Sequence, residues 1–307
     1  EGIYGVITEV TVRLHPIPSR RDYRGVLVSS FERGVDLIRA LVQAGVTPAV
    51  ARLSDTPETE VLMAMRKPPG SAFKAFIEKF ALRYLMRGPA AASPSRCLLI
   101  LGYEGSPNEV LTAWERAREI VREHEGLNAG SGPGASWFTG RFELPYLRDT
   151  LMDHGIMVDT FETSTSWSRL TALYHGIREA TQQALEREAG RGYVMCHLSH
   201  AYPDGASLYF TFTARQSDDA LGQWLAVKRA ATDAILAGGG ALSHHHAVGL
   251  DHAPWLAQEI GETGMKALEG IKQALDPGDC MNPGKLRGRM PALDGNGFGS
   301  TNGPSGN

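Results

Sequence analysis

The most conspicuous candidate for chemistry is a run of three histidines, His244, His245 and His246, which follows three glycines at 238–240. Glycines let a backbone turn sharply or pass close to a flat ligand, and imidazoles bind and release protons near neutral pH. Adjacent side chains of an extended chain point in opposite directions, so three neighbouring histidines are not expected to converge on one metal ion. The pattern favours a polar wall beside a cofactor, with a metal site and an exposed tract without function as the alternatives. We therefore predict no metal ligands.

A tyrosine on a predicted strand is the second candidate. Residues 207–212 alternate, so that Tyr209 shares one face with Ser207 and Thr211 while the other face is apolar. If the apolar face belongs to the core, Tyr209 points at a cleft. A tyrosine acts as a base only where its neighbours favour loss of its proton, and hydrogen bonds from the histidines would do this. The alternative is a tyrosine with a purely structural role.

Two arginines lie in settings that suggest an anionic ligand. Arg52 lies inside the apolar stretch 50–53, where a buried guanidinium needs a bound anion or a pairing acid. Arg148 follows Tyr146 and Leu147 and precedes an aspartate. The guanidinium fork binds a carboxylate or a phosphate through two hydrogen bonds. For each arginine the alternative is an ordinary salt bridge.

The elements that must position these side chains alternate between period-2 and helical patterns, which predicts an α+β fold with helices beside a sheet. The predicted strands are 6–14, 24–30, 48–54, 96–103, 155–164, 193–200 and 207–213. The predicted helices are 31–44, 108–125, 166–188, 217–236 and 253–275.

Three other stretches differ from this pattern. Residues 126–136 are rich in glycine and serine and predict a mobile loop. Residues 288–307 have almost nothing to bury and are expected to be disordered. Residues 72–87 place aromatic side chains on one helical face and basic ones elsewhere. They predict either a core helix with a solvated basic face or a helix that lines an acyl-chain tunnel or lies on a membrane surface.

The overall composition is that of an ordinary globular protein. The net charge of −3 offers no basic excess for nucleic acid, so no such partner is expected. Three cysteines far apart in the sequence, Cys97, Cys196 and Cys280, predict neither a disulfide framework nor a zinc ribbon. The apolar run 97–101 is far shorter than the ~20 residues of a membrane helix. We expect a cytoplasmic protein, with peripheral contact to a membrane as a further expectation.

Taken together, these segments resemble the alkylglycerone phosphate synthase branch of the vanillyl-alcohol-oxidase-type FAD-linked oxidases. The resemblance is carried by the stretches EGIYGVIT (1–8), ARLSD (51–55), YLRD (146–149), FETSTSW (161–167), LYF (208–210), SHHHAVG (243–249) and NPGKL (282–286). GVIT and NPGKL are shared widely among FAD-linked oxidases, whereas the histidine triplet together with YLRD and the tyrosine segment is much more specific. Ala247 stands where the family has glycine.

The resemblance implies the C-terminal cap, or substrate, domain of an FAD-linked oxidase, with an antiparallel sheet, flanking helices and a remnant of the FAD-binding domain. The implied domains are the remnant at 1–18, the cap domain at 19–240, a segment returning to the flavin at 241–287 and a disordered tail at 288–307. FAD is the implied cofactor. The implied FAD contacts are Glu1, Gly2, Ile3, Tyr4, Gly5, Val6, Ile7, Asn282 and Lys285. Because the phosphate-cradling loop would precede Glu1, this stretch alone is expected to bind FAD weakly and to be inactive.

The activity that the resemblance implies is an exchange without net redox in ether lipid synthesis. Acyl-dihydroxyacetone phosphate and a fatty alcohol would give the ether analogue and a fatty acid. Arg148 would hold the phosphate and Tyr209 would move the proton at the reacting carbon or the incoming alcohol. The three histidines would line the flavin and tune Tyr209, and Arg52 would orient the substrate or a histidine.

Alternatives to this activity remain. The rival enzyme is an FAD-dependent dehydrogenase or oxidase of a 2-hydroxy acid, in which an arginine grips the carboxylate. A third possibility is a chain that binds lipid or a partner without catalysis. A homodimer is a further expectation.

Overall fold

The computed structural model describes residues 1–65, 89–142 and 144–286. The chain forms two compact units, one of residues 9–247 and one of residues 1–8 together with residues from 248 onward. Each unit is described by itself. The predicted helix at 72–87 and the predicted tail at 288–307 lie outside the described residues.

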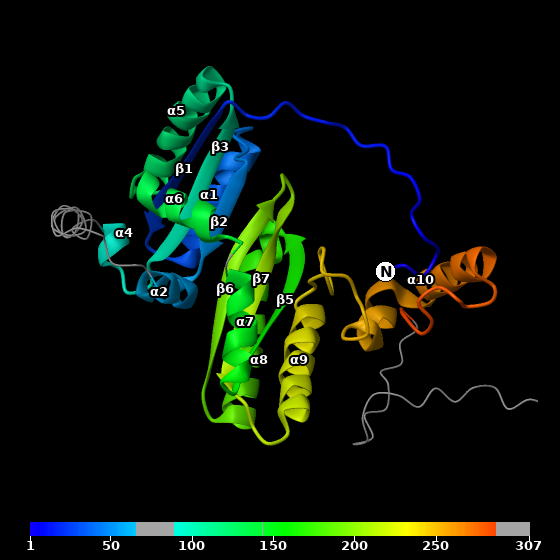
Figure 1. Ribbon diagram of the computed structural model, residues 1–307. Helices are drawn as coiled ribbons and strands as arrows, with labels where there is room; N and C mark the ends of the chain where they lie inside the picture. Colours follow the sequence, from blue (N-terminus) through cyan, green and yellow to red (C-terminus); the bar gives the residue numbers. More distant parts are fainter. Residues whose placement is uncertain (66–88, 143, 287–307) are drawn as a thin grey trace, which may run out of the picture. The chain divides into compact units, whose positions relative to one another are not determined.

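The larger unit is built on a seven-stranded sheet in the order β4-β1-β3-β2-β6-β7-β5, in which every neighbouring pair is antiparallel (Figure 1). The strands are β1 Arg20–Val28, β2 Val50–Ser54, β3 Cys97–Gly105, β4 Leu127–Asn128, β5 Ile156–Ser166, β6 Gly192–Ala201 and β7 Gly205–Arg215. The prediction of an α+β fold with an antiparallel sheet is therefore confirmed.

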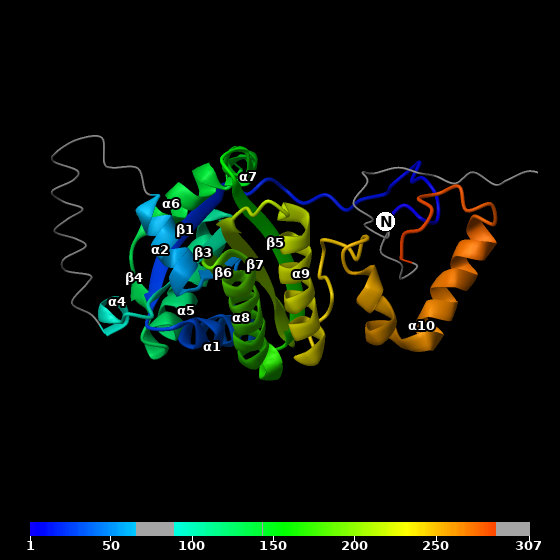
Figure 2. The same ribbon diagram turned by 90° about the horizontal axis from the view of Figure 1, so that it is seen from below.

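Helices cover the two faces of this sheet unequally. Figure 2 shows α1, α5 and α8 on one side and α6 and α7 on the other. The helices of this unit are α1 Phe31–Gln43, α2 Thr56–Ala64, α4 Pro89–Ala92, α5 Pro107–Glu123, α6 Ser131–Gly140, α7 Leu144–Asp153, α8 Trp167–Ala189 and α9 Ala220–Ala237. α9 packs on α8, and α7 lies against β5.

The core lies between the sheet and the layer that contains α1, α5 and α8. Leu208, Phe210 and Phe212 of β7 are fully buried, and the ring of Phe210 stacks on that of Phe161 at 5.1 Å. The alternation predicted for residues 207–212 is confirmed, because the side chain between two buried ones must point to the other face. That side chain is Tyr209, which is half-buried.

The predicted strand at 6–14 is wrong. These residues form no strand, and the apolar side chains among them are 65% to 85% exposed. The members with the largest exposure are Val6, Ile7, Val10, Val12 and Leu14. A period-2 pattern becomes a strand only when a neighbouring strand supplies hydrogen bonds, and the described residues provide none for this stretch.

The predicted mobile loop at 126–136 is also wrong, because this stretch contains β4 and the first half of α6. Gly134 lies so close to the backbone of Tyr23 that a Cβ atom there would collide with it. The Tyr23 ring in turn stacks on Phe138 at 5.1 Å and meets the edge of Trp137 at 6.1 Å. At position 134 glycine serves close packing of a helix on a strand and not flexibility.

The smaller unit contains α10 Ala253–Leu275, as the sequence predicts, although Gly261 (φ 70°) interrupts the helix. Across the described residues, no helix has the length and apolar character needed to cross a membrane.

Candidate active site

A row of polar side chains crosses four strands on the sheet face opposite the core. Ser54 of β2 is paired with His197 of β6, His197 with Tyr209 of β7, and Tyr209 with Glu162 of β5. Residues directly opposite each other in antiparallel strands lie on the same face. The register therefore brings Ser54 into one row with side chains more than 100 positions later in the sequence.

Arg52 belongs to a partly buried ion cluster beside this row. Its Nη2 donates to Oε1 of Glu58 at 2.8 Å and lies 3.1 Å from Nδ1 of His197. The same carboxylate oxygen is 3.1 Å from that Nδ1. Nη1 donates to Oγ of Ser54 at 3.1 Å. The sequence left a bound anion and a pairing acid as alternatives for Arg52. The structure supplies the pairing acid, Glu58, and adds a contact between the guanidinium and His197.

The start of α2 places Glu58 at this position. Asp55 caps the helix by accepting a hydrogen bond from the backbone N–H of Glu58 at 2.9 Å. Its other oxygen accepts from the hydroxyl of Tyr174 at 3.0 Å. Burial raises the pKa of Asp55 to about 6. The position of the Glu58 backbone thus depends on a carboxylate anchored in the core.

The charges in this cluster are set by burial and by Arg52. Burial alone would raise the pKa of Glu58, but the fields of His197 and Arg52 lower it to about 2. Burial, followed by the field of Arg52, lowers the pKa of His197. Glu58 is therefore ionised and His197 neutral near pH 7, so that Arg52 is the lasting counterion.

Tyr209 is held between two histidines. The imidazole of His197 stacks on its ring at 4.8 Å with an interplanar angle of 18°, and His246 meets the ring edge-on at 5.1 Å. Its hydroxyl donates to Oγ1 of Thr160 at 3.1 Å. The phenol is therefore oriented from three sides while remaining partly accessible.

The histidine triplet is folded around the carboxylate of Glu162, which is 1% exposed. Oε1 of Glu162 accepts hydrogen bonds from the backbone N–H groups of His244 at 2.8 Å, His246 at 2.6 Å and also His245. The hydroxyl of Ser243 donates to the same oxygen at 3.1 Å. Consecutive N–H groups that converge on one anion form a backbone nest.

This nest corrects the expectation of an extended triplet with diverging side chains. Its three N–H groups point to one oxygen, and Ala247, just after the triplet, has φ 72°. The ligand atoms of Glu162, His245 and His246 lie within 4.8 Å of one another, as do those of His200, His244 and His245. Each group holds only two of the three histidines, so that the prediction that the triplet does not converge on one metal ion stays a prediction.

The outer part of the cluster contains further polar contacts. Nε2 of His244 lies 3.1 Å from the hydroxyl of Tyr202, and the rings of His200 and His245 are 5.1 Å apart. Burial, followed by the fields of His245 and His244, lowers the pKa of His200. Burial also lowers the pKa of His246. A neutral imidazole accepts as well as donates, which suits proton transfer.

Arg148 is an exposed residue of α7, the helix that packs on β5. In the part of the chain that the structure describes, no ion pair or hydrogen bond joins Arg148 to Tyr209 or to the histidines around it. The structure therefore leaves its guanidinium accessible but does not join it to the residues predicted to act with it.

The predicted FAD contacts lie in the smaller unit. The carboxylate of Glu1 accepts from the backbone N–H groups of Val248 at 2.8 Å and Gly249 at 3.0 Å, and Nδ2 of Asn282 donates to Glu1 O at 2.6 Å. Lys272 donates to Ile3 O at 2.8 Å. The other predicted residues are the half-buried Tyr4 and Lys285 and the exposed Gly2, Gly5, Val6 and Ile7. The stretch that begins at Glu1 and the stretch that contains Asn282, both predicted to contact FAD, are thus in contact with each other.

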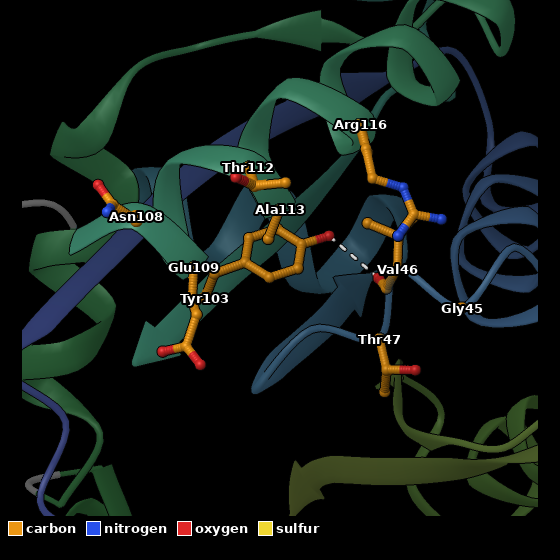
Figure 3. Close-up of a pocket in the computed structure, with 9 residues that line it drawn as sticks. All are labelled: Gly45, Val46, Thr47, Tyr103, Asn108, Glu109, Thr112, Ala113 and Arg116. Atoms are coloured by element: carbon orange, nitrogen blue, oxygen red, sulfur yellow. Dashed lines mark hydrogen bonds between the residues drawn. The ribbon is translucent and has the colours of Figure 1, made fainter. Parts of the chain in front are cut away.

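A surface hollow lies elsewhere in the larger unit, between the loop after α1 and the first turns of α5 (Figure 3). Tyr103 forms part of its wall and donates its hydroxyl hydrogen bond to Val46 O at 3.2 Å. None of the predicted site residues lines it.

Sequence reasoning missed three members of the site: Glu58, His197 and Glu162. Glu162 lies in the FETS stretch and Glu58 lies three residues after a helix cap, but neither pattern reveals a partner. His197 shares a strand face with no other predicted site residue. The register of β2, β6, β7 and β5 identifies His197 and Glu162 as neighbours of Tyr209, and the start of α2 brings Glu58 to His197.

Comparisons with known proteins agree with this geometry. Residues 17–286 match the family described as FAD linked oxidases, C-terminal domain. An alkyldihydroxyacetonephosphate synthase of Dictyostelium discoideum is 31% identical over 287 residues, which are 93% of this chain and 47% of the relative. The enzyme of the same name from Trypanosoma brucei brucei is 31% identical over 296 residues, 95% of this chain and 48% of the relative.

A solved structure of an alkyldihydroxyacetonephosphate synthase matches with a TM-score of 0.73 at 28% identity, covering 92% of this chain and 48% of that chain. The chain thus spans about half the length of the relatives it matches, and the resemblance seen in the motifs is confirmed. With the family match covering residues 17–286, the chain belongs to the family of the C-terminal domains of FAD linked oxidases.

Proposed function

We propose that this chain is the substrate-binding part of an FAD-dependent alkylglycerone-phosphate synthase-type transferase. The reaction exchanges the acyl group of acyl-dihydroxyacetone phosphate for a fatty alcohol in ether lipid synthesis. The observation that carries the proposal is the polar row in which Tyr209 lies between His197 and His246 on the sheet face opposite the core. The names of the relatives support the same activity.

Tyr209 is the proposed proton carrier. The residue is half-buried, and Thr160 orients its hydroxyl at 3.1 Å. His246, whose pKa is lowered by burial, is a neutral neighbour that accepts a proton. Together they are suited to move a proton at the carbon bearing the acyl group or at the alcohol that replaces it.

Arg148 is the proposed phosphate ligand, and Arg52 the proposed positioning residue for His197. The exposed guanidinium of Arg148 on α7 is available for a bidentate contact with phosphate. Arg52 already has a buried partner in Glu58 at 2.8 Å, and its second contact is with His197. Because its guanidinium is already paired with Glu58, Arg52 is suited to orient His197, and Arg148 is the arginine that remains for the phosphate.

FAD is the proposed cofactor. The residues of the smaller unit fit a flat ligand: Gly5 has φ 152°, and no heavy atom lies within 4 Å of the position of a Cβ atom there. The exposed backbone from Gly5 to Ile7, together with Asn282 and Lys285 of the same unit, is the proposed contact surface. FAD, when bound, would supply the electron-accepting centre at which the acid departs and the alcohol enters.

We also propose the predicted division into a flavin-contacting remnant, a cap domain and a returning segment. The contacts place the division between units after Ala247, whereas the predicted returning segment begins at 241. The difference arises because Ala241 and the histidines are hydrogen-bonded to β5 through Ser164, Thr163 and Glu162.

Contact with a membrane surface and a homodimer are further proposals. Lipid substrates reside in membranes, and Phe142 and Tyr146 before and in α7 are 70% and 77% exposed. Co-sedimentation with phosphatidylcholine vesicles tests the membrane contact, and replacing both aromatic residues by Ser should abolish the co-sedimentation.

The proposed homodimer is tested by the molar mass from light scattering.

The activity is tested with the full-length protein, loaded with FAD, under anaerobic conditions. We expect palmitoyl-dihydroxyacetone phosphate to release palmitate and to bleach the flavin spectrum, and hexadecanol to restore the spectrum while forming the ether product. An Arg148→Ala variant should raise KM for the ester, whereas Arg148→Lys should raise it less.

Two outcomes would contradict the proposal. The first is no response to the ester together with lasting flavin reduction by a 2-hydroxy acid, which identifies a dehydrogenase. The second is binding of the ester without release of acid, which identifies a lipid-binding chain.

A further inference from the structure

We propose that His200 of β6 and the first two histidines of the triplet, His244 and His245, form a site for Zn²⁺, an ion that imidazole ligands suit. The expectation of no metal ligands was argued from the three adjacent histidines alone, whereas here the third ligand comes from another strand. The effect of this site on activity rests on the proposed function, but the binding of the metal does not.

A bulge in β6 determines where His200 lies. The pairing of β6 with β7 is regular as far as Ser199 and resumes at Ala201, so that His200 is the extra residue. Its φ of 51° lies in the left-handed region, which is uncommon for a residue with a side chain. Bulges of this kind re-aim a side chain and are frequent beside active sites. The hydroxyls of Ser199 and Ser207 lie 3.2 and 3.4 Å from Nδ1 of His200 and orient its ring.

The three imidazoles form a nearly equilateral group. The ring of His200 lies 5.3 Å from that of His244 and 5.1 Å from that of His245, and the latter two rings are 5.3 Å apart. One nitrogen of each ring lies within 4.8 Å of a nitrogen of both others.

These separations are close to those of a zinc site. Nitrogens bound to one tetrahedral Zn²⁺ ion at about 2.0–2.1 Å lie about 3.3 Å from each other. The Nδ1 atoms of His244 and His245 are 3.1 Å apart, so these two rings already have this spacing. The third nitrogen needs to approach by about 1.5 Å at most. Because the side chain of His200 is exposed, rotation about its bonds can supply this movement.

A buried negative charge lies beside the group. Four hydrogen bonds donated to Oε1 of Glu162 favour the ionised form of this carboxylate. Its Oε2 lies 2.7 Å from Nδ1 of His245 and 3.8 Å from Nδ1 of His244. None of the described residues forms a hydrogen bond with Oε2, so its effect on the two rings is electrostatic. A cation held by the histidines compensates this charge, and the attraction is stronger in a buried setting than in water.

A second group of three side chains, Glu162 with His245 and His246, is less suited to hold an ion. It depends on Oε2 of Glu162, which is buried, so that an ion would reach it only after the surrounding residues repack. His200 and His245 are exposed and His244 is half-buried. An ion from solvent therefore has access to the proposed site.

The consequence of binding falls on proton transfer. His244 and His245 belong to the triplet expected to line the flavin and tune Tyr209, and a nitrogen that binds a metal ion cannot accept a proton. We therefore expect Zn²⁺ to inhibit the exchange reversibly and a chelator to restore it. The ion is an inhibitor of the proposed transferase and not a resident cofactor.

Isothermal titration calorimetry of the full-length protein with FAD, stripped of metal beforehand, tests the site. We expect one Zn²⁺ to bind per chain. Loss of an outer-shell contact costs about 10- to 100-fold in metal affinity, so loss of a ligand in His200→Gln should cost about 100-fold or more. His175→Gln is the matched control, because it removes an exposed histidine that contacts Glu32 on another part of the surface. It should bind Zn²⁺ as the unaltered protein does.

Co²⁺ gives a second measurement on the unaltered protein. In tetrahedral coordination by imidazoles this ion absorbs visible light strongly, at wavelengths longer than those of the flavin, whereas Co²⁺ in water absorbs weakly. We expect the strong absorption on addition of Co²⁺ and its loss when Zn²⁺ is added.

Two results would overturn the site. One is no binding of Zn²⁺ by the unaltered protein, measured with FAD bound and again without it. The other is equal affinity in the unaltered protein and His200→Gln, which would place the ion elsewhere. Binding is measured without substrate, so failure of this inference and failure of the proposed reaction are distinguishable.

The expected inhibition is tested separately, with each protein compared with its own rate in the absence of metal. Zn²⁺ should inhibit the exchange by the unaltered protein and inhibit His200→Gln much less at the same concentration. Binding without inhibition would contradict the expected effect on proton transfer.

Discussion

The buried carboxylates decide what the residues around Tyr209 can do. Glu58 contacts Arg52 and His197 on one side of the ring, and Glu162 holds the backbone of the histidine triplet on the other. Removing one partner from such a buried pair leaves a charge without compensation, which costs far more than the pair contributes. Substitutions here must therefore preserve shape while changing a single proton or charge.

Tyr209→Phe is the smallest change that tests the proposed proton carrier. Loss of the hydroxyl should lower kcat for the exchange by a factor on the order of 10² to 10⁴, because no oxygen remains to carry the proton. The melting temperature should change little, since only one partly exposed hydrogen bond is lost. Steady-state kinetics and thermal unfolding measure both quantities.

Thr160→Val is the control for this substitution. It removes the acceptor of the same hydrogen bond and leaves the phenol in place. A Tyr209→Phe enzyme that keeps wild-type kcat would argue against proton transfer by the tyrosine, and a Thr160→Val enzyme should lose less activity than Tyr209→Phe because the phenol remains.

Glu58 should make the fold sensitive to acid. Its pKa falls from the ordinary 4.5 to about 2 on folding, so its contribution is present above pH 4.5 and lost as the pH falls towards 2. The loss is on the order of 3 kcal/mol in the free energy of unfolding. Asp55, with its pKa raised to about 6, acts in the opposite sense between pH 6 and its ordinary value of 3.8.

Urea unfolding at several pH values between 5 and 2 tests this expectation. The fall in stability below pH 4 should be smaller in Glu58→Gln than in the unaltered protein. Glu60→Gln changes an exposed carboxylate of the same helix and should leave the fall as it is. Parallel curves for the unaltered protein and Glu58→Gln would refute the assignment.

At the scale of elements, the sequence predicted most strands and helices of the larger unit, because hydrophobic period and caps are local signals. α1, α5 and α8 lie within a few residues of their predicted ranges. The two errors, at 6–14 and 126–136, share a physical cause: both segments depend on what lies against them. The same limit explains the site: the alternating pattern predicts the orientation of Tyr209, whereas Glu162 becomes its neighbour through strand register and Glu58 reaches His197 through the position of α2.

α6 provides a direct test of this dependence on packing. Gly134→Ala should destabilise the protein by about 1–3 kcal/mol, because the new methyl group collides with the backbone of Tyr23. Gly132→Ala in the same helix meets no atom within 4 Å and should be neutral or stabilising by up to about 1 kcal/mol.

Denaturant unfolding of the two glycine variants measures the difference. The reverse order of stability, or equal stability, would show that α6 does not depend on close contact with β1.

At the scale of the whole molecule, the chain joins its first eight residues to a segment more than 240 positions away. Lys272 is the centre of this junction: 4% exposed, it donates to Ile3 O at 2.8 Å and Met281 O at 2.7 Å and pairs with Asp276 at 2.5 Å. Burial alone would lower the pKa of Lys272, but its contacts with Asp276 and Asp279 raise it above the ordinary value. One ammonium group thus satisfies backbone carbonyls from both ends of the smaller unit.

A protease recognition sequence inserted after Arg13, in the exposed stretch between the units, tests whether this junction holds without the covalent link. After cleavage we expect residues 1–13 to remain bound in size-exclusion chromatography. Lys272→Met should release them, because Ile3 O loses its donor and Asp276 its counterion. Lys266→Met removes an exposed lysine of the same helix and should retain them. Release of the segment from the unaltered protein would mean that the contacts of Lys272 do not hold the two ends together, and the proposed flavin surface would then need a further partner to form.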